Sequence, residues 1–338
     1  MSRHPGVCPA SPPNKPPPAH DRRPLPLRVG TRASPLALTQ TRLFLARLSG
    51  FCPVLRDAEA FEEHPIATTG DRVTDRRLAD LGGKGLFAKE IHEALLDRRI
   101  DFAVHSLKDL ETELPPGIVL ACCLAREDAR DALVLAPHCG PVDLGDPLSA
   151  IPPGGTVGTS SVRRAAQLRH RRPDIAVALL RGNVGTRLAR VAAGELDATL
   201  LAYAGLRRLG LEGAAAAVLD PESMVPAAGQ GIVGITVRED DSELRELLGA
   251  IEDPEAAAVS RAERALLAAL DGSCRTPIGG HAELRPDGTL RLVGLVASED
   301  GTFLLKRAIV GAPENAVRLG RELGLSLRRD SPAEIFAS

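Results

Sequence analysis

The sequence predicts an α/β protein with two α/β domains of mainly parallel sheets, followed by a small α+β domain. Short apolar runs alternate with helical patterns through the first two thirds of the chain. In the last third, alternating strand patterns separated by glycine-containing turns take over. The 338 residues, 44% of them hydrophobic, are enough for two domains and a small third.

The N-terminal stretch 1–26 precedes the first of these patterns and contains nine prolines. No apolar segment follows its basic residues, so it does not have the pattern of a secretory signal. We expect a disordered tail, or residues upstream of the true start.

The elements of the first domain are expected in the following order. Leu27-Arg-Val-Gly30 has strand character and precedes a helix near 35–48. Apolar residues recur at helical spacing between Gly85 and Arg99. Two further strands are expected at 101–105 and 118–123.

A second series of elements begins with a strand at 132–135. Further strands are expected near 156–158, 175–180 and 197–203, and helices near 161–170 and 184–193. The last domain is expected to contain a helix near 254–270, strands near 281–284, 290–297 and 303–309, and a closing helix near 313–324.

Composition excludes several classes of function. The net charge is −2, with no Trp and one Tyr, so neither a basic field nor a base-stacking surface for nucleic acid is expected. No apolar run approaches the ~18 residues of a membrane span. The six cysteines contain no C-x-x-C pair, so we expect cytosolic thiols and no metal site.

Three Arg-rich loops follow predicted strands and open or flank helices. They are Gly30–Ser34, Val157–Arg164 and Leu180–Arg187. Ligands of open α/β sheets bind at the carboxyl ends of strands, where helix N-termini and guanidinium groups favour anions. The loops together predict one polyanion cleft, although each alone is also typical of solvated arginines and helix caps.

Three other segments carry chemistry. His105-Ser-Leu-Lys-Asp109 sets Lys and Asp side by side after a strand. Gly82-Gly-Lys-Gly-Leu-Phe87 lacks the spacing of a P-loop and suggests a flap that carries Lys84. Cys274, beside Arg275 in a Gly/Pro-rich loop, is a candidate for a covalent adduct. A surface charge cluster and an idle loop cysteine are the alternatives at the first and last segments.

In their order along the chain, these segments resemble the porphobilinogen deaminase (hydroxymethylbilane synthase) family over about residues 27–330. The matching segments are Gly30–Leu38, Gly82–Phe87, His105–Asp109, Val157–Arg164, Leu180–Arg187, Ala204–Gly210, Pro226–Gly231 and Gly272–Cys274.

The resemblance implies two periplasmic-binding-protein-like α/β domains with the active cleft between them, and a third domain that carries the cofactor. The implied division is 27–125 with 229–250 for domain 1, 126–228 for domain 2 and 251–338 for domain 3. Pro226, Gly229 and Gly231 are then hinge candidates on the return crossing.

The resemblance also implies a transferase of tetrapyrrole (haem) biosynthesis, cytoplasmic and monomeric. It would condense four porphobilinogen molecules head to tail into hydroxymethylbilane, losing ammonia at each step. The primer would be dipyrromethane, held by a thioether to Cys274. Each pyrrole unit carries two carboxylates, which a cleft lined by guanidinium groups would bind.

The family's functional residues carry over to matching positions. Asp109 matches the catalytic aspartate, which would stabilise the cation left when ammonia departs. Cofactor-binding positions are Cys274, Lys84, Lys108, Thr159, Ser160, Ser161, Arg163, Arg164, Arg187 and Arg208. Substrate-binding positions are Arg32, Ser34, Phe87 and Arg181.

Three residues depart from the family's pattern: Asp80, Glu111 and Ser273. Glu111 would either raise the pKa of Asp109 or face solvent. A different class of function is a non-catalytic two-lobed module that binds an anionic solute. Such a module would have no reason to combine Asp109 with an exposed Cys274.

Overall fold

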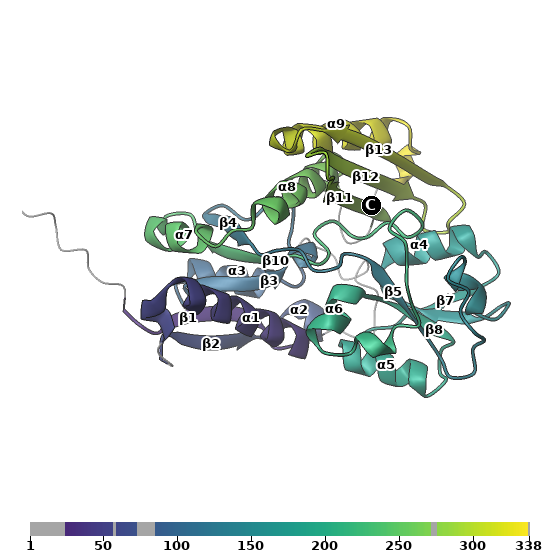
Figure 1. The fold of residues 1–338 in the computed structure, drawn as a ribbon, viewed down its shortest axis with the longest axis horizontal. Helices are drawn as coiled ribbons and strands as arrows, with labels where there is room; N and C mark the ends of the chain where they lie inside the picture. Colours follow the sequence, from purple (N-terminus) through teal and green to yellow (C-terminus); the bar gives the residue numbers. More distant parts are fainter. Residues whose placement is uncertain (1–23, 57–58, 73–84, 272–275, 337–338) are drawn as a thin grey trace, which may run out of the picture.

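The computed structural model describes residues 24–56, 59–72, 85–271 and 276–336. Within these residues the strands form two five-stranded sheets and one three-stranded sheet (Figure 1). Helices pack on the large sheets, and the small sheet packs against two helices of its own. The predicted α/β class with a small α+β unit is therefore confirmed.

The first large sheet has the strand order β2-β1-β3-β10-β4. Its strands are β1 (Leu27–Arg32), β2 (Phe61–Ile66), β3 (Phe102–Ser106), β4 (Ile118–Cys123) and β10 (Val233–Arg238). The helices of this lobe are α1 (Pro35–Phe51), α2 (Thr69–Arg72), α3 (Lys89–Leu96) and α7 (Ser242–Gly249). Ser34 caps α1, because its Oγ accepts the backbone N–H of Ala37 at 3.3 Å.

The second large sheet has the order β7-β6-β8-β5-β9. Its strands are β5 (Asp131–Leu135), β6 (Thr156–Gly158), β7 (Ala176–Ala178), β8 (Ala198–Ala202) and β9 (Ala217–Val218). The helices of this lobe are α4 (Val162–Arg171), α5 (Val184–Ala192) and α6 (Tyr203–Arg208).

The expectation of mainly parallel sheets is wrong for half of the described strand pairings in the two large sheets. In the first sheet β10 runs antiparallel to both β3 and β4, and in the second β5 runs antiparallel to both β8 and β9. Both β10 and β5 begin directly after the chain has crossed from the other lobe. These two strands therefore start at the sheet edge where the parallel strands end. From there they can only run antiparallel to those strands.

The chain crosses between the lobes twice, at residues 124–130 (the first crossing) and 219–232 (the second or return crossing), and the two segments lie side by side. The backbone N–H of Glu127 on the first crossing donates to the carbonyl of Gly231 on the second, at 3.1 Å. Gly231 has φ +90°, and a Cβ there would lie 2.2 Å from the carbonyl oxygen of Glu127. Only glycine fits this close approach of two backbones.

The third sheet consists of β11 (Ile278–Leu284), β12 (Leu290–Ala297) and β13 (Leu304–Gly311), all antiparallel. The helices α8 (Pro254–Ala269) and α9 (Ala316–Arg329) pack against it and against each other (Figure 1). Leu319, Leu323 and Leu327 on α9 are buried in this core, and each contributes about 1.5–3 kcal/mol.

Glu263 of α8 joins both crossings to the third sheet. Its side chain is fully buried, and its Oε1 accepts from Nη1 of Arg126 and from the backbone N–H of Ala282, each at 2.7 Å. Its Oε2 accepts from the backbone N–H of Gly229 at 2.6 Å. One buried carboxylate thus connects the two crossings and the third sheet. The domain boundaries themselves stay a prediction.

Several elements were not predicted from the sequence: β2, β9, β10, α2, α6 and α7. The edge strand β2 carries charges and Pro65, and an edge tolerates proline that a central strand does not. The strand β10 is buried along its whole length, so it lacks the alternation that marks a half-buried strand. No helix in the described part of the chain has both the length and the apolar character that crossing a membrane requires.

Candidate active-site cleft

The predicted site residues gather where the parallel strands of both large sheets end. Arg32 is the last residue of β1, and Asp109 follows β3. Thr159 follows β6, and Arg181 follows β7 in the second lobe. Open α/β sheets place their ligand sites at this edge, because loops and helix N-termini converge there.

Arg32 links the carboxylates of Asp71 and Asp109 in the first lobe. Its Nη1 donates to Oδ2 of Asp109 at 3.1 Å, and its Nε donates to Oδ2 of Asp71 at 3.2 Å. Its Nη2 donates to the other oxygen of Asp71. Within the described part of the chain, Oδ1 of Asp109 accepts no hydrogen bond, and the Asp109 side chain is 27% exposed. The carboxylate is therefore fixed on one side and open on the other.

The charges in this group support one another. Burial alone would lower the pKa of Arg32, but its hydrogen bond to Asp71 and the charge of Asp109 raise it above its ordinary value. Burial would raise the pKa of Asp71, but the hydrogen bonds from Arg32 and Thr68 lower it instead. Arg32 and Asp71 thus stay ionised, and Arg32 supplies a permanent cation beside Asp109.

Phe87 and Arg181 complete this wall of the cleft. The guanidinium carbon of Arg32 lies 4.1 Å from the centre of the Phe87 ring, a cation–π contact. Nη2 of Arg181 donates to the carbonyl of Gly70 in the other lobe at 2.7 Å. A side chain of the second lobe therefore reaches across the cleft to the first.

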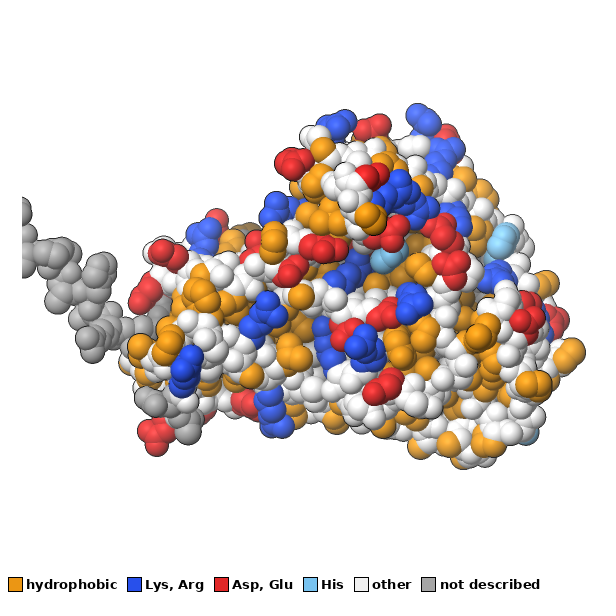
Figure 2. Space-filling model, in the orientation of Figure 1, with side chains coloured by type: hydrophobic (Ala, Val, Ile, Leu, Met, Phe, Trp, Pro, Cys, Tyr) orange, Lys and Arg blue, Asp and Glu red, His pale blue; other side chains and the backbone are white. Residues whose placement is uncertain are grey.

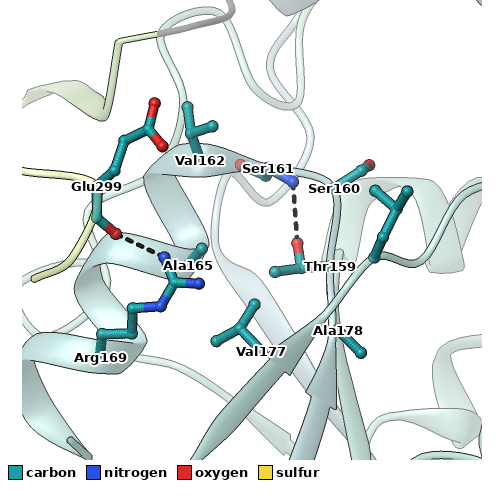
Figure 3. A pocket seen from close by; sticks show the side chains of 10 residues that line it. Thr159, Ser160, Ser161, Val162, Ala165, Arg169, Val177, Ala178 and Glu299 are labelled. Atoms are coloured by element: carbon teal, nitrogen blue, oxygen red, sulfur yellow. Dashed lines mark hydrogen bonds between the residues drawn. The ribbon is translucent and has the colours of Figure 1, made fainter. Parts of the chain in front are cut away.

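Hydroxyl groups surround the N-terminus of α4. Ser161 caps the helix, because its Oγ accepts the backbone N–H of Arg164 at 3.4 Å. Oγ1 of Thr159 accepts the backbone N–H of Ser161 at 3.1 Å (Figure 3). With Ser160, these residues line a pocket beside which Arg169 donates to the carbonyl of Glu299 at 2.6 Å.

Arg163 and Arg164 converge on one buried carboxylate. Nη2 of Arg163 and Nη2 of Arg164 donate to the two oxygens of Asp131, at 2.9 and 2.7 Å. Burial would raise the pKa of Asp131, but the two guanidinium groups hold it far below its usual value. In the described residues, the Nε atoms of both arginines are buried without a partner. The Nη groups of both arginines, by contrast, all donate to acceptors within the protein.

Three other cations make no ion pair within the described residues, although acidic neighbours partly offset their loss of hydration. Burial, together with the charge of Arg164, lowers the pKa of Lys108 to about 8. Burial and the neighbouring Arg164 and Arg181 lower the pKa of Arg187 to about 10. Burial also lowers the pKa of Arg208. Each of these cations would be stabilised by an anion entering the cleft.

Within the described residues, the hydrogen bonds that these three cations donate go to neutral groups. Nζ of Lys108 lies 3.5 Å from the amide oxygen of Gln230. Nε of Arg187 donates to the carbonyl of Gly182 at 2.8 Å, and Nη2 of Arg208 donates to the carbonyl of Gly231 at 2.7 Å. These contacts orient the cations, while nearby carboxylates offset their charges only in part.

Some predictions fall elsewhere. Lys84, Cys274, Asp80 and Ser273 lie outside the described residues. The suggestion that Glu111 faces solvent is wrong: its side chain is 10% exposed, and Oε1 lies 3.9 Å from Nδ1 of His92.

Sequence reasoning missed Asp71 and Asp131. Asp71 lies in Thr68-Thr-Gly-Asp71, directly after an edge strand that was not predicted. Asp131 is a single acid at the start of an otherwise apolar strand. A charge in that position was the available signal, because a buried carboxylate requires a cationic partner.

The surface outside the cleft is electrostatically mixed. Acidic and basic side chains are interspersed over the face shown in Figure 2, in keeping with the small net charge.

Two family models match the chain. Residues 27–246 match "Porphobilinogen deaminase, dipyromethane cofactor binding domain", and residues 257–329 match "Porphobilinogen deaminase, C-terminal domain". A porphobilinogen deaminase of Syntrophobacter fumaroxidans is 47% identical over 301 residues, covering 89% of this chain and 94% of that protein. One of Sorangium cellulosum is 47% identical over 310 residues, covering 90% and 99%.

Solved structures with some likeness include a periplasmic domain and an ancestral binding protein. The periplasmic VFT2 domain of Bordetella pertussis BvgS is 16% identical with a TM-score of 0.38, covering 70% of this chain and 92% of that chain. An ancestral amino acid-binding protein is 15% identical with a TM-score of 0.35, covering 67% and 87%.

Proposed function

The chain belongs to the porphobilinogen deaminase family, and from this premise we propose how its cleft residues serve the family's reaction. The protein is a transferase of tetrapyrrole biosynthesis. It condenses four porphobilinogen molecules head to tail into hydroxymethylbilane and releases ammonia at each step. Family membership supports this reaction and not the non-catalytic binding module.

The residues of the cleft fit the dipyrromethane cofactor. Lys108 and Arg187 have lowered pKa values because burial and neighbouring cations oppose their charges. Carboxylates of the cofactor would relieve this repulsion, and guanidinium groups bind carboxylates well. When bound, dipyrromethane supplies the primer to which substrate units are added. We assign its thioether attachment to Cys274.

Asp109 is proposed to stabilise positive charge on the substrate. Loss of ammonia from porphobilinogen leaves an electrophilic cation, and a nearby carboxylate stabilises its positive charge. Arg32 holds Oδ2 of Asp109, while Oδ1 accepts no hydrogen bond within the described residues. Arg32 also pairs with Asp71, so its positive charge is shared between two carboxylates.

The remaining predicted residues are proposed to bind carboxylates or to shape the cleft. Arg208, Thr159, Ser160 and Lys84 are assigned to the cofactor, with Ser161 also capping α4. Arg163 and Arg164 are assigned to the same site, anchored by Asp131. For the substrate we propose Arg32, Ser34, Phe87 and Arg181.

The lobes are proposed to move about the paired crossings. The proposed division is 27–125 with 229–250, then 126–228, then 251–338. Gly229 and Gly231 have φ values of +74° and +90°, and both lie on the return crossing beside Pro226. The contacts of Glu263 with Arg126 and Gly229 support a third domain that packs against these crossing segments. We also propose a cytoplasmic monomer.

The observation that carries the proposal is that Arg32 holds Asp109 near Lys108 and Arg187, two cations that make no ion pair within the described residues. The test is to incubate the purified protein with porphobilinogen and to measure ammonia and linear tetrapyrrole together. We expect four ammonia molecules for each hydroxymethylbilane. Binding of porphobilinogen without ammonia release would overturn the proposal.

A further inference from the structure

Three side chains of different chemistry meet at the end of the second sheet that faces away from the cleft. His138 and Cys139 lie in the turn after β5, and Asp197 lies directly before β8. Since β5 and β8 are antiparallel neighbours, the end of one and the start of the other share an edge. One ligand atom from each residue lies within 4.8 Å of the other two.

The backbone holds this cluster in place. The N–H of Ala136 donates to the carbonyl of Asp197 at 2.8 Å, and the N–H of Cys139 donates to the carbonyl of Ala136 at 3.0 Å. The N–H of Asp197 donates to the carbonyl of Thr156 at 3.0 Å. The turn and the strand start are thus tied to the sheet and to each other.

The carboxylate is also oriented. Oδ2 of Asp197 accepts the backbone N–H of Thr156 at 2.6 Å, which turns Oδ1 toward Nε2 of His138, at 2.7 Å. A hydrogen bond to the outer oxygen of a ligating carboxylate is the usual support of a metal site. Sγ of Cys139 donates to the carbonyl of Asp197 at 3.3 Å, so the thiol lies against the same residue.

We propose that His138, Cys139 and Asp197 bind Zn²⁺. Imidazole nitrogen, thiolate sulfur and carboxylate oxygen are the three ligand types that zinc takes from proteins. Bond lengths of roughly 2.0–2.3 Å place tetrahedral ligands roughly 3.3–3.8 Å apart, so small side-chain movements close the site. The side chains of His138 and Asp197 are 51% and 22% exposed, which leaves the fourth position to water.

Zinc uptake replaces one proton. The Cys139 thiol loses its proton to solvent, the Zn–S bond forms, and no electron is transferred. A cation bound to the folded chain alone stabilises that fold by mass action. The site lies at the far end of β8 from α6, roughly 17 Å for five residues, so it is separate from the cleft.

Cobalt and zinc titrations test the proposal. Holoenzyme stripped with a chelator is titrated with Co²⁺, whose thiolate charge-transfer absorption reports a sulfur ligand, and Zn²⁺ is then added as competitor. The variants are Cys139→Ser and His138→Ala, and the matched control is Cys52→Ser, a half-buried free cysteine in the first lobe. Thermal melts without metal verify that each variant is folded.

We expect one equivalent of Co²⁺ on the wild type and on Cys52→Ser, with a charge-transfer band that zinc removes. Cys139→Ser should lose the band, and His138→Ala should bind at least about tenfold more weakly. Porphobilinogen turnover should be unchanged in all four proteins. An unchanged band in Cys139→Ser, or equal affinity in wild type and His138→Ala, would overturn the zinc site without affecting the proposed function.

Discussion

Nη1 of Arg32 donates to Oδ2 of Asp109 across 3.1 Å, so the last residue of β1 holds the carboxylate that follows β3. The two residues are 77 positions apart in sequence. Parallel pairing of β1 with β3 brings them together, because the ends of both strands lie at one sheet edge. The predictions below begin from this contact.

Replacement of Asp109 by Asn should lower kcat by about 10²–10³-fold or more, because the amide does not stabilise a cation as the carboxylate does. The measurement is porphobilinogen consumption with the cofactor-loaded protein. Glu113→Gln, which neutralises an exposed acid four residues away, is the control and should retain its rate. Near-normal turnover in Asp109→Asn would refute the assigned role.

Replacement of Arg32 by Lys should reduce kcat/KM by about tenfold or more. Lysine keeps the charge but cannot hold Asp71 with two nitrogens while also reaching Asp109. Arg42→Lys is the control, because Arg42 pairs with Glu63 at an exposed position. Equal effects of the two changes would show that the geometry of Arg32 is unimportant.

Asp131→Asn should lower the free energy of unfolding by about 3–5 kcal/mol, since two buried guanidinium groups lose their shared carboxylate. Urea unfolding measures this change. Asp128→Asn, which breaks a more exposed pair with Arg130, should cost less than about 1 kcal/mol. A loss at Asp131 no larger than at Asp128 would contradict the buried pairing.

The lowered pKa of Lys108 predicts a pH dependence of stability. Between about pH 8 and pH 10.5 the unfolded chain binds the proton and the folded chain does not, so raising the pH favours folding. In cofactor-free protein, the stability of wild type relative to Lys108→Met should therefore rise across this range by roughly 2–3 kcal/mol.

Urea unfolding of both proteins at several pH values measures this difference. A flat or falling difference for Lys108 would mean that its charge is not opposed in the folded state.

The sequence predicted those parts of the site that are local in the chain. Arg32 and Asp109 each come shortly after a recognisable strand pattern. Their place at the carboxyl ends of the strands therefore followed from the fold class. Asp71 and Asp131 were missed because their roles depend on partners 39 and 32 or 33 residues away. A one-dimensional pattern does not show which cation a buried acid meets.

The same limit applies to strand direction and to metal ligands. Nothing in Val233–Arg238 shows that β10 returns to the first sheet antiparallel, because that follows from where the chain crosses between lobes. His138 and Asp197 are 59 residues apart, so their cluster has no spacing that a short motif would reveal.

The covalent cofactor is the central claim, and the mass of the intact, denatured protein tests it most directly. We predict an excess equal to two deaminated porphobilinogen units, located by peptide mapping on Cys274 and absent from Cys274→Ser. A cofactor-free preparation should gain the same mass when porphobilinogen is added. A bare-chain mass before and after that addition, or an intact adduct on Cys274→Ser, would contradict the account.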